Sequence, residues 1–71
     1  MNIEEDDWTL VYKESGLPVS AGDRHMSFRG NEATIFTGRP PHKPSSEGFV
    51  YTSDSREFYP SVFSLAWRRD V

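Results

Sequence analysis

The chain has 71 residues, no cysteine and a formal net charge of −3. This length allows one domain, and the lack of cysteine excludes disulfides and thiolate metal sites. No apolar run approaches the roughly 20 residues of a membrane span, and the acidic start lacks the hydrophobic segment of a signal peptide. We therefore expect a small, monomeric protein of the cytoplasm, whose core depends on its ten Phe, Tyr and Trp residues.

The negative charge is concentrated at the N-terminus. Residues 1–14 have a net charge of −4, whereas residues 15–71 have a net charge of +1. We expect residues 1–7 to form a flexible acidic tail, outside a single β domain of residues 8–71. The tail is either simply solvated or a contact to a basic partner surface. Its candidate contact residues are Glu4, Glu5, Asp6 and Asp7.

Strand-forming residues alternate with turn signals along the rest of the chain. The expected strands are residues 8–13, 25–29, 33–37, 49–52, 56–59 and 66–68. Alternation in the first strand puts Trp8, Leu10 and Tyr12 on one face, and in the second it points Met26 and Phe28 inward. Between the second and third strands, the Gly-Asn pair predicts a tight turn.

Pro60 suits the first position of a short helical turn, with the last strand directly after it. The competing interpretation is one continuous strand over residues 62–68. No segment has the period of a longer helix. The sequence therefore predicts an all-β fold, a small SH3-like barrel or β-meander of five to six short strands with at most a one-turn helix.

The proline-rich stretch TGRPPHKPSS, which begins at Thr37, is the most unusual feature of the chain. Proline fixes φ, lacks an N–H and pushes the preceding residue towards an extended conformation, so a stiff loop is expected. Such a loop could be a preorganised basic binding element. It could equally be a plain connection that packs Pro40 and Pro44 over one end of the barrel. Its candidate binding residues are Arg39, His42 and Lys43.

The two tryptophans could serve the core or a binding surface. A domain this small needs large buried rings, so we expect both Trp8 and Trp67 in the core. An exposed tryptophan would instead be a candidate binding anchor, because Trp, Tyr and Arg dominate binding hot spots. Arg68 and Arg69 follow Trp67 and would extend such a patch.

Signals for catalysis are weak. The chain has no cysteine nucleophile and no glycine-rich phosphate loop, and His25 and His42 are its only histidines. Two histidines cannot form an all-His metal site, and the acidic tail lacks the spaced ligands of a calcium loop. His25 is expected to be a surface or hydrogen-bonded side chain. We therefore expect no enzymatic activity, no cofactor and no metal.

Two stretches resemble a family of small tailed-phage proteins: GRPPHKPSS from Gly38, and YPSVF from Tyr59. The resemblance spans roughly residues 28–67 and leaves out the acidic start. Phage proteins of this size commonly bind and redirect host machinery. The resemblance implies a non-enzymatic regulator of host RNA polymerase that inhibits initiation, promotes antitermination, or does both. The implied partners are the polymerase β′ subunit and a Nus-type elongation factor.

Two other functions remain open at this point. One is a small barrel that binds nucleic acid with Arg39, Lys43, Tyr51 and Trp67 as its phosphate-binding and stacking face. The net charge of −3 disfavours this function, because nucleic-acid binders usually present a basic face. The other is a structural or assembly component of the virion.

Overall fold

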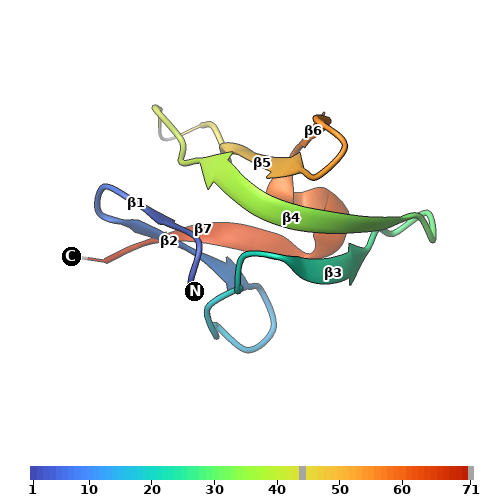
Figure 1. Cartoon of the computed structure of the whole chain (residues 1–71). Coiled ribbons are helices and arrows are strands. Elements are labelled where there is room, and N and C mark those ends of the chain that lie inside the picture. The colour runs from blue at the N-terminus through green and yellow to red at the C-terminus, as the bar shows by residue number, and fades with distance from the viewer. Residues whose placement is uncertain (44, 71) are drawn as a thin grey trace.

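A computed structural model describes residues 1–43 and 45–70. The protein is all-β, as predicted, but the described residues form seven strands in two antiparallel sheets where five to six strands were expected. The sheets face each other and enclose the core (Figure 1). The first sheet has the order β1 (Glu4–Glu5), β2 (Trp8–Tyr12) and β7 (Leu65–Arg69). The second has the order β3 (Asp23–Met26), β4 (Glu32–Arg39), β5 (Phe49–Thr52) and β6 (Glu57–Phe58).

The core forms where inward residues of both sheets meet. In the first sheet, Leu10 lies opposite Trp67 and Tyr12 lies opposite Leu65. Trp8 and Tyr12 pack against the core from the same strand as Leu10, as the alternation predicted. The buried hydrophobic cluster consists of Ile3, Leu10, Val19, Ile35, Val50, Phe63, Leu65 and Trp67.

The predicted helical turn is confirmed as a 3₁₀ helix, η1 (Pro60–Phe63). Pro60 occupies its first turn and is buried, and Ser64 ends it in a left-handed conformation with φ of 59°. Strand β7 then returns to pair with β2, so the alternative of one continuous strand is wrong. No described helix is long and apolar enough to cross a membrane.

The N-terminus differs from the expected tail. Ile3 is only 5% exposed, and its N–H donates to the carbonyl of Val19 at 3.0 Å. Glu4 and Glu5 form β1, which pairs with β2. The domain therefore starts well before residue 8. The sequence interpretation overlooked Ile3, the single apolar residue between Met1 and the run of four acidic residues.

Strand β3 also differs from its prediction. Met26 and Phe28 were expected to point inward, but they are 58% and 75% exposed. His25, expected at the surface or hydrogen-bonded, is 7% exposed, and its Nε2 is buried without a hydrogen-bond partner among the described residues. Because neighbouring strand residues face opposite ways, burial of His25 places Met26 on the outer face. The ring of His25 packs between Tyr12 and Phe63.

The loop in the proline-rich stretch begins later than predicted. Residues up to Arg39 remain in β4 and pair with β5, with a register irregularity between Ile35 and Thr37. The loop starts at Pro40, which is buried. Burial of Pro40 agrees with the plain-connection interpretation, whereas Pro44, its proposed companion, lies outside the described residues.

Candidate functional site

The loop after β4 is positioned by Trp67. The indole N–H of Trp67 donates to the carbonyl oxygen of Phe49 at 3.2 Å. Two glycines leave room for the ring: a Cβ on Gly38 would lie 2.7 Å from its Cζ2, and one on Gly48 would lie 2.8 Å from its Cδ1. Gly48 also has a φ of 78°, which L-residues rarely adopt. Trp67 therefore fixes both ends of the loop against β7 while remaining core, as predicted.

Trp8 forms the centre of a groove at this end of the molecule. It begins β2, is half-buried, and lies opposite Arg69 of β7. The guanidinium carbon of Arg69 is 5.9 Å from the centre of the Trp8 ring. The groove has a volume of about 360 Å³ and is lined by Trp8, Pro41, His42, Lys43 and Arg69. Three of the predicted binding residues, His42 and Lys43 from the loop and Arg69 from β7, thus meet around one tryptophan.

A second hollow, of about 260 Å³, continues along β7. It shares Trp8, Pro41 and Lys43 with the first groove and adds Lys13. The carboxylate of Glu47 also lines it, but this carboxylate accepts a hydrogen bond from the backbone N–H of Ser61 at 3.0 Å. We call the two hollows together the Trp8 groove. Its cationic groups on an aromatic floor suit carboxylate-bearing and aromatic groups of a partner.

The four acidic residues belong to the hairpin that leads into Trp8. Glu4 and Glu5 form β1; Glu5 is paired with Trp8, whereas Glu4 is paired with Thr9 and so belongs to the opposite face of the sheet. Asp6 and Asp7 form the turn to β2, and all four side chains are exposed. The backbone N–H of Asp70 donates to the carbonyl of Asp7 at 2.6 Å, which ties the hairpin to the end of β7. The β1–β2 hairpin therefore lies at the same end of the molecule as the proline-rich loop (Figure 1).

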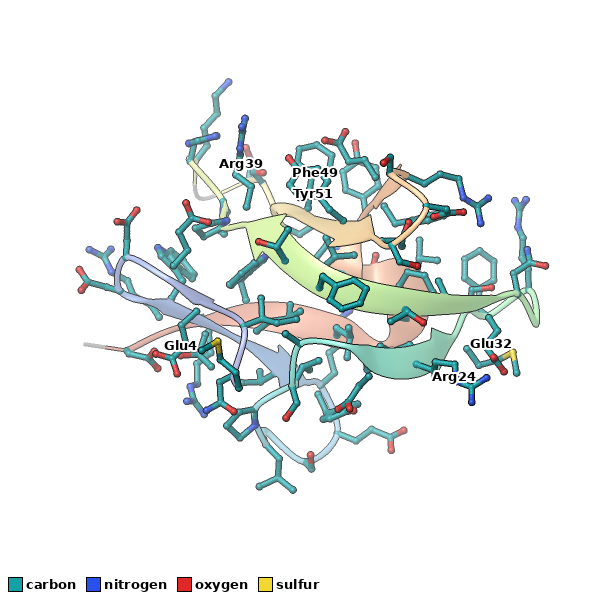
Figure 2. The ribbon with its side chains drawn as sticks, in the orientation of Figure 1. Glu4, Arg24, Glu32, Arg39, Phe49 and Tyr51 are labelled. Carbon is teal, nitrogen blue, oxygen red and sulfur yellow. The ribbon has the colours of Figure 1, made fainter. Side chains whose placement is uncertain are left out.

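Two predicted residues lie outside the groove. Arg68 is on the other face of β7, where it donates to the carbonyl of Gly16 at 3.1 Å and to the carboxylate of Asp70. Arg39 is exposed and lies near Phe49 and Tyr51 on the second sheet (Figure 2). Desolvation and a hydrogen bond to Glu57 raise the pKa of Tyr51, while the charge of Arg39 opposes the rise.

The proposed nucleic-acid face is not assembled as the sequence suggested. Trp67 is 8% exposed and its N–H is already used, so its ring cannot stack on a base. Lys43 faces the Trp8 groove, whereas Arg39 and Tyr51 belong to the second sheet. The described residues contain no group of three or more His, Cys, Asp or Glu side chains that could hold a metal ion.

Sequence reasoning missed the roles of Trp8 and Lys13 in the groove. Trp8 was expected in the core, and it does pack against the core while its half-exposed ring lines the groove. The available signal was its position directly after four acidic residues, which is unusual for the start of a buried strand. No protein-family model, curated protein or solved structure matches the chain.

Proposed function

We propose that the protein is a non-enzymatic regulator that binds a host protein machine through the Trp8 groove and the acidic hairpin of residues 4–7. The observation that carries this proposal is that Lys43, Arg69 and Glu5 come together around one half-buried tryptophan, Trp8. Aromatic and arginine side chains are enriched at the centres of protein interfaces, and charged rims speed association. A hairpin bearing four carboxylates would repel a phosphate backbone, which favours a protein partner over nucleic acid.

Host RNA polymerase is the leading partner because of the resemblance to small tailed-phage proteins. On this proposal the protein acts in the cytoplasm of the infected cell and contacts the β′ subunit together with a Nus-type elongation factor. Binding would inhibit initiation at host promoters, promote antitermination, or do both. The acidic hairpin would face a basic surface of the polymerase, and the Trp8 groove would receive an acidic or aromatic segment beside it.

The test is binding kinetics to purified host polymerase at two ionic strengths. Replacing Glu4, Glu5, Asp6 and Asp7 with Ser should slow association several-fold and weaken its salt dependence, because rim charges act mainly through steering. The matched control makes the same change in charge elsewhere on the surface. It replaces Glu14, Asp23, Glu32 and Glu57 with Ser and should leave association close to that of the unmodified protein.

A second variant tests the groove itself. Replacing Lys43 and Arg69 with Ser should mainly raise the dissociation rate, because these side chains line the groove beside Trp8. Circular dichroism should show an unchanged fold for each variant. If both variants and the control bind alike, this end of the molecule is not the interface and the proposal fails. In a pull-down from host lysate, loss of all bound proteins after nuclease treatment would favour the nucleic-acid alternative.

A further inference from the structure

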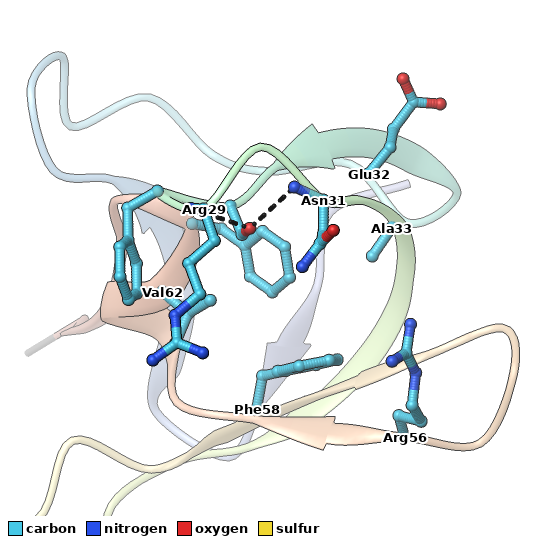
Figure 3. Close-up of a pocket in the computed structure, with 10 residues that line it drawn as sticks. Arg29, Asn31, Glu32, Ala33, Arg56, Phe58 and Val62 are labelled. Atoms are coloured by element: carbon cyan, nitrogen blue, oxygen red, sulfur yellow. Dashed lines mark hydrogen bonds between the residues drawn. The ribbon is translucent and has the colours of Figure 1, made fainter.

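The turn from β3 to β4 lies at the opposite end of the molecule from the β1–β2 hairpin (Figure 1). A separate pocket opens beside this turn (Figure 3). It has a volume of about 250 Å³ and opens between this turn, β6 and η1. Its apolar lining comes from Phe28, Ala33, Phe58, Val62 and Phe63. Phe58 and Phe63 meet edge to face with ring centres 5.4 Å apart, which makes a firm aromatic wall.

Phe28 is held at the mouth of this pocket although it is 75% exposed. Its backbone N–H donates to the carbonyl of Val62 at 3.1 Å, which ties the turn to η1. Within the turn, the hydroxyl of Ser27 accepts hydrogen bonds from the N–H groups of Arg29 and Asn31 (Figure 3). The exposed ring therefore belongs to a well-braced turn, and binding would require little ordering of this segment.

Two arginines flank the apolar lining. The guanidinium carbon of Arg29 is 5.5 Å from the centre of the Phe28 ring, and that of Arg56 is 5.3 Å from the centre of the Phe58 ring. Arg56 also forms an ion pair with Asp54, whereas Arg29 makes no ion pair within residues 1–43 and 45–70. Glu32, the acidic residue of the lining, is paired with Arg24 at 3.0 Å. The pocket mouth thus retains positive charge in a protein whose net charge is negative.

We infer that this pocket binds an acidic peptide segment of a partner protein, with one large apolar side chain inserted between Phe28 and Phe58. Carboxylates beside that side chain would pair with Arg29 and Arg56, since planar guanidinium groups match carboxylate geometry. The volume of about 250 Å³ suits a single Leu or Phe side chain rather than a whole helix face. This site is separate from the Trp8 groove and does not depend on the proposed polymerase contact.

The test is a nuclear magnetic resonance titration of the whole, isotope-labelled protein with three synthetic hexapeptides. The first has the sequence Glu-Asp-Leu-Phe-Asp-Glu, the second replaces Leu-Phe by Ser-Ser, and the third replaces every acidic residue by Lys. The first peptide should shift the amide signals of residues 27–33 and 56–63, with a dissociation constant below about 1 mM. The other two should bind at least tenfold more weakly.

Two variants of exposed side chains, Arg29→Ala and Phe28→Ser, test whether the peptide binds in this pocket. Each should raise the dissociation constant of the first peptide at least fivefold. The control, Lys43→Ser in the Trp8 groove, should leave this dissociation constant unchanged. The inference is overturned if the first peptide causes no shifts at 2 mM, if the lysine peptide binds as well, or if oligouridylate shifts the same signals more strongly.

Discussion

Truncation of Trp67 should remove a large part of the stability of this domain. The side chain is 8% exposed, wedged between two glycines and hydrogen-bonded to Phe49. Loss of a buried aromatic ring costs about 3–5 kcal/mol, and loss of the donor to Phe49 adds ~1 kcal/mol. At roughly 0.05–0.15 kcal/mol per residue, a chain of 71 residues has a free energy of unfolding of about 4–11 kcal/mol. Trp67→Ala should therefore remove about 4–6 kcal/mol, which is roughly a third to a half of this free energy at the upper end of the range and all of it at the lower end.

Urea unfolding followed by far-ultraviolet circular dichroism measures this loss directly. Trp67→Phe keeps much of the ring but loses the indole N–H, so it should cost an intermediate ~1.5–3 kcal/mol. Phe28→Ala is the control, since a ring that is 75% exposed should change the free energy of unfolding by no more than about 0.5 kcal/mol. A loss below about 1 kcal/mol in Trp67→Ala, with an unchanged slope against urea, would refute the assignment of Trp67 as the core anchor of the loop.

Three further changes test other parts of the fold. Ile3→Ala should cost about 2–4 kcal/mol in urea unfolding, because Ile3 is 5% exposed; no measurable loss would restore the flexible-tail interpretation. Gly48→Ala should lower the free energy of unfolding by about 1–3 kcal/mol, because the new Cβ would lie 2.5 Å from a backbone oxygen. Gly30→Ala has open space around it, so it should lower this free energy only by the ~1 kcal/mol that a positive φ costs. Burial lowers the pKa of His25 against the opposing charge of Asp23, so the unfolded state binds this proton more readily. The free energy of unfolding should therefore fall as pH drops through about 6.5 and below. His25→Leu should flatten this pH dependence, and an equally steep decline in the variant and the unmodified protein would show that His25 is not its cause.

The sequence predicted much of the sheet because its turns and strands carry strong local signals. Phe49–Thr52 was expected as a strand with the bounds that the structure has, and Pro60 was expected to open a short helical turn. The N-terminal strand could not be predicted in the same way. A two-residue strand of Glu4 and Glu5 has no strand propensity of its own. Its pairing follows from burial of Ile3 against the core, which is a tertiary effect.

The candidate site was predicted in its parts but not in its assembly. His42, Lys43 and Arg69 were identified from their residue types, and the fold brings all three to Trp8. Arg68 was grouped with Arg69 because the two are adjacent, yet neighbouring residues of a strand face opposite sides. No sequence signal places the proline-rich loop over β7, because that position depends on the contact of Trp67 with the two glycines.

The largest disagreement between sequence and structure lies beside the second pocket. Hydrophobicity favours burying Met26 and Phe28, but the protein buries His25 and Ser27 instead. Burial of a histidine nitrogen without a partner is costly, and so is exposure of a phenylalanine ring. Positions where local preference and fold disagree tend to concentrate at functional sites, where binding compensates for the lost stability. Because Phe28 faces outward, its ring lies beside Arg29 at the mouth of the pocket. An apolar ring next to a cationic group is what the proposed binding of an acidic segment with one apolar side chain requires.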